Sequence, residues 1–215
     1  LYYSSKGLIY YGKKKQSNDN VARKEVIKNL MQCKDVKLFG ITFATVVSVG
    51  ITGAVQIGHS KNVLKSTEVY LDDILSPYAS GDGKGMSTYG DEFRVDKAHY
   101  IYNFGINPKE YLKYEELDIE FTQEDYELFK KYSLDSVTRL NTRSKMGCEN
   151  HFAMFIKIKE GEYFTPNLRK YINALEKDDE ITYDLEELSK VLKDIDYKVD
   201  NIEIYYNPMS IQLDN

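Results

Sequence analysis

Residues 122–140, TQEDYELFKKYSLDSVTRL, constrain the fold most, because they carry two independent helix signals. Thr122 and Asp125 stand at the spacing of a capping box, with Asp in the place that Glu more often takes. An apolar stripe then recurs at helical spacing, at Tyr126, Phe129, Leu134, Val137 and Leu140. The stretch therefore predicts an amphipathic helix that lays one face against a core.

Strand patterns lie on both sides of this helix. HFAMFIKIKEG, residues 151–161, alternates as a half-buried strand does, and YKVDNIEIYYN, 197–207, predicts a last strand after a helix at about 183–194. Upstream, the patterns predict a strand at 1–11 and a helix from about 18–20, with Val21, Val26, Ile27, Leu30 and Met31 on its apolar face. Further strands are predicted at 51–58, 66–71 and 92–105, and a loop at 72–91.

This order of elements predicts an α+β fold, with helices on one face of an antiparallel sheet. A split β-α-β layout of the ferredoxin or RNA-recognition-motif type is the expected architecture. The 215 residues suit one domain, 1–215, with residues 72–91 as an insertion. The chain starts at Leu1 rather than Met, so we expect an upstream segment to be missing.

Two features bear on the compartment. Cys33 and Cys148 lie far apart, which predicts free buried thiols in a reducing cytoplasm rather than a disulfide framework. The longest apolar run, 38–55, is interrupted by glycine, serine and threonine and is too polar for a membrane span. A cytoplasmic protein without a membrane partner is therefore expected.

Charge is unevenly spread along the chain. The net charge is −5, which argues weakly against nucleic acid. Residues 1–100 hold 14 Lys and Arg against 10 Asp and Glu, whereas residues 101–215 hold 15 against 24. An acidic half can face solvent while the other half contacts a polyanion, so the net charge does not decide whether the protein binds nucleic acid. The acidic stretches at 115–127 and 176–203 are expected to face away from any RNA.

Signals for catalysis are weak. The three histidines stand in no nucleophile motif, and His99 is expected to be a packed residue. No zinc or EF-hand spacing is present. SGDGKG, 80–85, lacks the spacing of a phosphate-binding loop, and Asp72, Asp73 and Asp82 are expected to be solvated loop acids. Neither a metal nor a cofactor is therefore expected.

Three separate stretches combine donors with glycines: residues 56–62 (QIGHSKN), 84–94 and 139–145. Phosphates are bound by Lys, Arg, Ser, Asn and backbone N–H groups, and glycine lets the backbone approach them. Each stretch alone is commonplace, but the three together favour binding of a polyanion. The first stretch is the sharpest, because ITGAVQIGHSKN begins as a buried strand and then turns polar at Gln56 and after Gly58.

Five quoted pieces together resemble a known family: KDVKLFG, ITGAVQIGHSKN, GKGMSTYGDEFRVDKAHYIYNFGIN, TRLNTRSKMG and FAMFIKIKEG. This spaced set resembles the backbone subunit of Cascade-type CRISPR interference complexes, the CRISPR-associated "seven" family, and most of all subtype I-B. The likeness covers about residues 19–206. The family's first strand and its N-P-N-G-D-P-like turn have no counterpart, which again suggests a missing upstream segment.

The resemblance implies a non-catalytic bacterial protein of antiviral defence. Copies of it would form a filament along a guide RNA (crRNA), with other Cascade subunits and a target DNA strand as further partners. Residues 72–91 would form a thumb with Met86 as a wedge between nucleotides. The RNA-binding residues implied are Gln56, His59, Ser60, Lys61, Asn62, Lys84, Met86, Ser87, Arg94, Arg139, Arg143 and Lys145.

Two alternatives stay open at this stage. One is a metal-dependent endoribonuclease that uses Asp35, Asp72 or Asp73, as type III relatives of the family cut RNA with a loop aspartate. The other is a structural scaffold that binds only protein.

Overall fold

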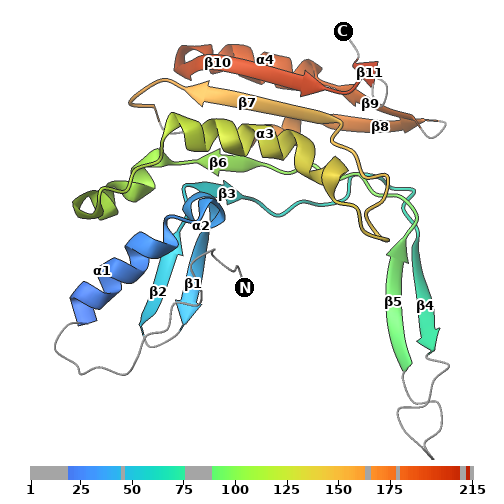
Figure 1. Cartoon of the computed structure of the whole chain (residues 1–215). Helices are drawn as coiled ribbons and strands as arrows, with labels where there is room; N and C mark the ends of the chain where they lie inside the picture. The colour runs from blue at the N-terminus through green and yellow to red at the C-terminus, as the bar shows by residue number, and fades with distance from the viewer. Residues whose placement is uncertain are drawn as a thin grey trace, which may run out of the picture. The chain divides into compact units, whose positions relative to one another are not determined.

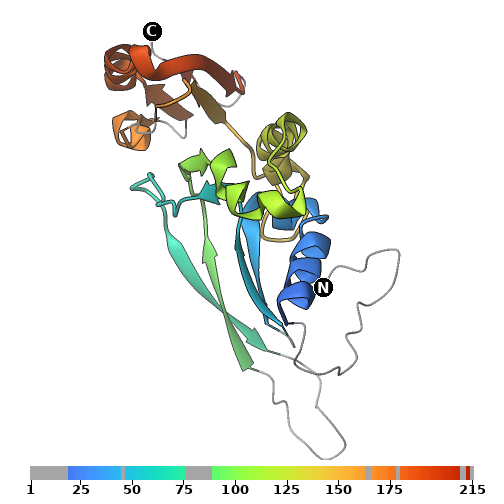
Figure 2. The same ribbon diagram turned by 90° about the vertical axis from the view of Figure 1, so that its left-hand side faces the viewer.

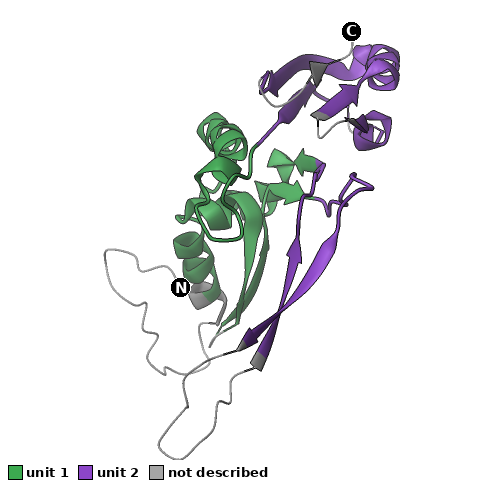
Figure 3. Cartoon of the chain, turned by 90° about the vertical axis from the view of Figure 1, so that its right-hand side faces the viewer, with its two compact units in different colours: residues 1–57, 104–149 green, residues 58–103, 150–215 purple. Residues whose placement is uncertain are grey.

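The computed structural model describes residues 19–44, 47–75, 89–162, 166–177, 180–208 and 212–213. The chain divides into two compact units, which Figure 3 colours separately. Unit 1 comprises residues 1–57 and 104–149, and unit 2 comprises residues 58–103 and 150–215. The predicted strand at 1–11 lies outside the described residues, and the single RNA-recognition-like domain stays a prediction.

Unit 1 combines helices with two small antiparallel sheets, β1–β2 and β3–β6 (Figure 1). Its elements are α1 (Asp19–Leu30), α2 (Lys34–Phe39), β1 (Gly40–Ala44), β2 (Ser48–Thr52), β3 (Val55–Ile57), β6 (Phe104–Ile106), the 3-10 helix η1 (Pro108–Leu117) and α3 (Gln123–Arg139). The main core gathers Val26, Ile27, Met31, Val36, Val49, Ile51, Ala54 and Tyr111. Of the five residues predicted for the apolar face of the first helix, Val26, Ile27 and Met31 are thus buried, and Leu30 packs against them.

The glycine that ends KDVKLFG is required by a close backbone crossing. Gly40 has a φ of +81°, and a Cβ on it would lie 2.2 Å from the carbonyl oxygen of Ile51. A Cβ on Gly53 would likewise lie 2.3 Å from the carbonyl oxygen of Leu38. Side chains at either position would force the two segments apart. This crossing divides the strand predicted at 51–58: β2 pairs with β1, and β3 pairs with β6.

Tyr111 joins α2 and the β2–β3 connection through its hydroxyl. The ring is 2% exposed, the backbone N–H of Ala54 donates to Oη at 3.2 Å, and Oη donates to the carbonyl of Lys37. We expect Tyr111→Phe to lower the free energy of unfolding by roughly 1–3 kcal/mol, because two buried backbone groups would lose their partner. Urea unfolding followed by circular dichroism measures this. Tyr132→Phe, at a position 50% exposed on α3, is the control and should change little.

The N-terminus of α3 is built as its sequence predicts. The Thr122 side chain accepts from the N–H of Asp125 at 3.3 Å, and the Thr122 N–H donates to Asp125 Oδ2 at 3.0 Å. Two lysines of α2 add to this box: Nζ of Lys37 lies 2.5 Å from Oδ2 of Asp125, and Nζ of Lys34 lies 2.9 Å from its Oδ1. The carboxylate, which is 0% exposed, therefore ties α2 to α3.

Unit 2 consists mainly of strands in three sheets. A hairpin pairs β4 (Val69–Leu75) with β5 (Tyr89–Val95), and β7 (Phe152–Ile158) pairs with β10 (Val199–Tyr206). A third sheet has the order β11 (Gln212–Leu213), β9 (Glu180–Asp184), β8 (Asn173–Lys177), in which β11 runs parallel to β9. The helices are η2 (Leu168–Tyr171), α4 (Glu186–Asp194) and η3 (Asp196–Lys198).

The hairpin corrects two sequence predictions. The sequence predicts a loop at 72–91, but β4 continues to Leu75 and β5 already begins at Tyr89, and the residues between the two strands lie outside the described residues. The two strands lie side by side in Figure 2. The strand placed at 92–105 is two strands, β5 and β6. Cross-strand pairing produces the difference, since alternation alone does not show where a strand finds its partner. Asp72 and Asp73 therefore belong to a strand and not to a loop.

The coarse prediction is confirmed: the protein is α+β with antiparallel pairing in all ladders but one. The described residues form five small sheets instead of one continuous sheet. The prediction for the cysteines was right in one part and wrong in another. Both are free as expected, but Cys33 is exposed and Cys148 is partly exposed, so neither is a buried thiol.

Candidate nucleic-acid interface

The polar end of ITGAVQIGHSKN runs beside a second extended stretch of unit 2. The N–H of Gly58 donates to the carbonyl of Asn103 at 2.8 Å, and the N–H of Val63 donates to the carbonyl of His99 at 2.8 Å. Between them, Asn62 and Tyr100 form an antiparallel bridge. We call residues 58–63 and 99–103 the paired segments. They contain no Asp or Glu.

Asn62 holds the paired segments together and does not face outward as a donor. Its Oδ1 accepts from the N–H of His99 at 2.8 Å and from that of Leu64 at 3.2 Å. Its Nδ2 donates to Oγ1 of Thr67. Contacts on both ends of the amide give Asn62 a structural role, and direct RNA binding by Asn62 stays a prediction.

Ser60 and Arg169 make a second set of cross-links. Oγ of Ser60 donates to the carbonyl of Ile101 at 2.6 Å. Nη1 of Arg169, from η2, donates to the carbonyl of His59 at 2.8 Å and lies 3.4 Å from that of Ile101. Arg169 was missed by sequence reasoning because it lies 110 residues from His59 and 68 residues from Ile101 along the chain. It adds a cation to the paired segments and fixes their backbone.

Two predicted residues of the paired segments do present their side chains to solvent. His59 and Lys61 are both exposed, on either side of the anchored Ser60. Gln56 is also exposed, but it lies on β3 of unit 1, where its Nε2 donates to the carbonyl of Gly53 at 3.0 Å. His59 and Lys61 are thus exposed on one short stretch, and their contact with RNA stays a prediction.

Arg94, from the second predicted stretch, lies on the β4–β5 hairpin. Its Nε is 3.4 Å from Oδ2 of Asp72, and its guanidinium carbon lies 5.8 Å from the centre of the Tyr70 ring. Cross-strand pairing also puts Asp72 opposite Glu92 and Asp73 opposite Asp91. The described part of the hairpin is therefore acidic overall. Lys84, Met86 and Ser87, the expected thumb residues, lie outside the described residues.

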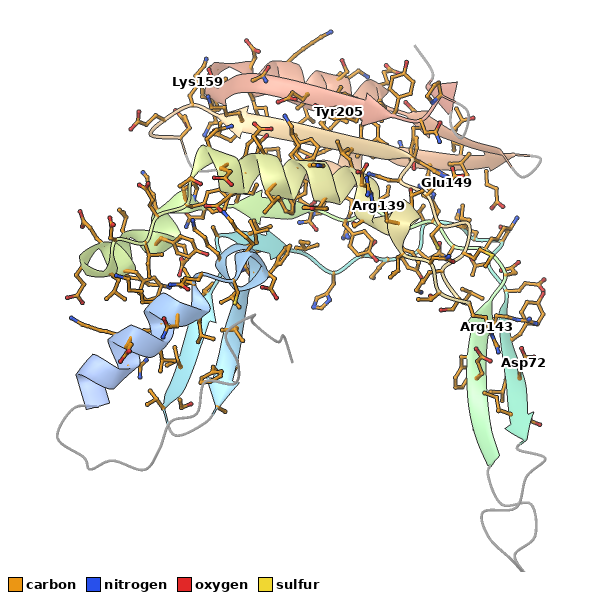
Figure 4. All side chains as sticks on the ribbon, in the orientation of Figure 1. Asp72, Arg139, Arg143, Glu149, Lys159 and Tyr205 are labelled. Carbon is orange, nitrogen blue, oxygen red and sulfur yellow. The ribbon has the colours of Figure 1, made fainter. Side chains whose placement is uncertain are left out.

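The third predicted stretch lies in unit 1, at the end of α3 and in the turn after it. Arg139 pairs with Asp135 at 2.8 Å one helical turn earlier, and its label in Figure 4 marks the C-terminal end of α3. Arg143 and Lys145 follow in an exposed turn, closed by a 3.0 Å bond from the N–H of Lys145 to the carbonyl of Thr142. Among the predicted set, the residues that share one local structure are His59, Ser60, Lys61 and Asn62.

His99 points away from the exposed side chains into an aromatic cluster of unit 2. Its ring lies 5.2 Å from that of His151 and 5.5 Å from that of Tyr183, and its Nε2 shares a hydrogen bond with the Tyr183 hydroxyl. Burial lowers the pKa of His99 to about 4, with a smaller effect from His151. Burial also raises the pKa of Tyr183 to about 12. The packed role predicted for His99 fits this position, and a neutral imidazole completes the cluster.

One acidic residue does approach the flanks of the paired segments. Glu176, from the stretch 176–203, accepts from Nζ of Lys97 at 2.6 Å and from Oγ of Ser66 at 2.7 Å. The lysine compensates its charge, so this carboxylate adds little local repulsion against an anion. Among the residues that the structure describes, no group of three His, Cys, Asp or Glu side chains could hold a metal ion.

The family model for CRISPR-associated protein Cas7 matches residues 2–200, and the chain belongs to this family. No curated protein matches the chain. Within the described parts of the chain, no helix is both long and apolar enough to cross a bilayer.

Proposed function

We propose that this protein is a guide-RNA-binding backbone subunit of a type I CRISPR surveillance complex, closest to subtype I-B. Family membership carries the proposal, and the exposed donors of the paired segments support it. The subunit binds the sugar-phosphate backbone without reading sequence, through Lys61 and His59. Arg139, Arg143, Lys145 and Gln56 of unit 1 remain proposed contacts, as do Lys84, Met86, Ser87 and Arg94.

The subunit has a binding role and no catalytic one in this proposal. An RNA-recognition-type core carries the groove, copies assemble along the guide in the cytoplasm, and other Cascade subunits complete the complex. Target DNA then meets the protein through the guide. Because many adjacent copies share one strand, a single copy is expected to bind weakly and a row of copies tightly.

The test is binding of a fluorescently labelled single-stranded RNA of about 40 nucleotides, long enough for several copies. Anisotropy is measured from about 50 mM to about 200 mM salt. We expect affinity to fall steeply with salt, and Lys61→Ala to reduce the slope of log K against log[salt] by about 1. Lys193→Ala, at an exposed position of α4, should leave the slope unchanged.

Two outcomes would favour the alternatives. Self-association of the wild-type chain without salt-sensitive RNA binding, even at low salt, would point to the protein-only scaffold. RNA cleavage that EDTA abolishes would point to the metal-dependent endoribonuclease.

A further inference from the structure

Two tyrosines of the paired segments are exposed side by side. Tyr100 is 48% exposed and Tyr102 is 59% exposed, and their ring centres lie 6.3 Å apart at 42°. Side chains two residues apart in an extended chain point to the same side. His99 and Ile101, the residues that alternate with them, are more buried. The neighbouring rings together offer an aromatic surface that a ligand can cover.

The backbone that carries these rings is held by contacts at His99, Tyr100 and Ile101. The N–H of His99 donates to Asn62, Tyr100 bridges Asn62, and the carbonyl of Ile101 accepts from Oγ of Ser60 at 2.6 Å. Arg169 adds its contact with the same carbonyl at 3.4 Å. A surface fixed before binding loses less entropy when a ligand docks. The two rings are therefore presented by a pre-organised strand.

Two cations accompany the paired segments. Lys61 is exposed on the segment 58–63, and the Arg169 guanidinium donates to the carbonyl of His59 on the same segment. Aromatic side chains that hold bases, next to cations that hold phosphates, are the combination used to bind single-stranded nucleic acid without sequence preference. A protein partner would match the rings but would not need the cations.

We propose that Tyr100 and Tyr102 form a stacking platform for unpaired bases of the bound guide RNA. This inference rests on the proposed function and deepens it: the cations hold the backbone and the tyrosine rings hold bases. Stacking is tolerant of sequence because every base has an aromatic face. The platform adds affinity that salt does not screen, in contrast to the phosphate contacts.

The test compares three variants with wild type. Tyr100→Leu/Tyr102→Leu removes both rings, Tyr100→Phe/Tyr102→Phe keeps them without hydroxyls, and Tyr197→Leu removes a ring that is 65% exposed elsewhere in unit 2. Binding is measured by anisotropy over the same salt series, and stacking by quenching of 2-aminopurine placed in the RNA. Circular dichroism confirms that each variant folds.

The Leu pair is expected to lose roughly 10-fold or more in affinity at every salt concentration, with an unchanged salt slope and less quenching. The Phe pair and Tyr197→Leu should bind as wild type does. Wild-type affinity in the Leu pair would overturn the platform and leave RNA binding standing. So would an equal loss in the Phe pair, which would assign the effect to hydroxyl hydrogen bonds.

Two further results separate the remaining possibilities. If the Leu pair keeps RNA affinity but loses self-association in sedimentation, the tyrosines contact a second copy and the platform is refuted. If the same strand made of DNA suffers the loss and RNA does not, the assignment to the guide is refuted. Absence of RNA binding by wild type would overturn the proposed function itself.

Discussion

Replacing Asp125 with Asn is expected to lower the free energy of unfolding of unit 1 by about 3 kcal/mol. The carboxylate is 0% exposed and accepts from Lys34, Lys37 and Thr122. Asn keeps the shape but removes the charge, so Lys37, whose side chain is only 16% exposed, would lose its counter-ion. The Lys34 side chain is 48% exposed, so its ammonium group can be solvated after the substitution. The expected loss of stability therefore lies at the lower end of the range for breaking a buried ion pair.

Hydrogen exchange of peptides that cover α2 and α3, together with urea unfolding, measures this effect. Glu124→Gln is the matched control, because its side chain is 84% exposed and lies 3.9 Å from Lys34 in the same helical turn. The control should shift stability by less than about 1 kcal/mol. Equal stability of Asp125→Asn and wild type would mean that the capping box alone holds α3.

Acid pH should remove the stabilisation that the Asp125 carboxylate provides. Burial by itself would raise the pKa of Asp125, but hydrogen bonds from Lys37, Thr122 and Lys34 hold that pKa below its usual range. A depressed carboxyl pKa contributes stability that is present above the unfolded-state value of about 3.9 and is lost as the pH falls below it. Near neutral pH the contribution of Asp125 to the stability of unit 1 should be fully present and should not vary with pH, and acid unfolding below about pH 4 should be steeper than in Asp125→Asn.

The second large effect concerns His99 and milder acid. Its pKa is lowered to about 4 by burial, whereas an unfolded histidine titrates near 6.5. The unfolded chain thus binds a proton that the folded chain does not, so stability is lost as the pH falls from about 6.5 toward 4. Allowing for the partial exposure of the ring, we expect a loss of about 2 kcal/mol across this window.

Unfolding of unit 2 at pH 7.5 and pH 4.5, followed by hydrogen exchange of peptides around residues 99–103 and 180–184, reports this loss. Other groups face the cluster and must be considered. Tyr183 stays protonated throughout, and His151 packs against His99, so His151→Gln is measured in parallel. His99→Gln should flatten the pH dependence at the cost of some stability at pH 7.5. An unaltered pH profile in His99→Gln would assign the proton uptake to another group.

Sequence reasoning succeeded where the signal was local. The capping box at Thr122, the alternation of β7 and the apolar face of α1 all depend on residues within a few positions of one another. The outward His59 and Lys61 were found for the same reason, because a strand that turns polar is visible in the sequence itself.

The failures share a different cause, which is contact between distant segments. The sequence did not reveal that the Asn62 amide contacts His99 and Thr67. Arg169 reaches the paired segments from η2, and the split between β2 and β3 follows from the crossing of Gly40 and Gly53. None of these pairings leaves a mark on its own stretch of sequence. Only the folded structure shows that Asn62 links the paired segments and that Arg169 contacts their backbone.

The acidic pairs of the β4–β5 hairpin have a consequence for solubility. Val69, Leu71 and Phe93 are 57–75% exposed on this ribbon, and within the described part of the chain neither outer strand edge has a partner strand. Such a ribbon is a template for strand addition between molecules. Asp72 opposite Glu92 and Asp73 opposite Asp91 weaken the hairpin through like charge, but the same charges repel any second ribbon that approaches in register. The carboxylates thus oppose aggregation through this hairpin.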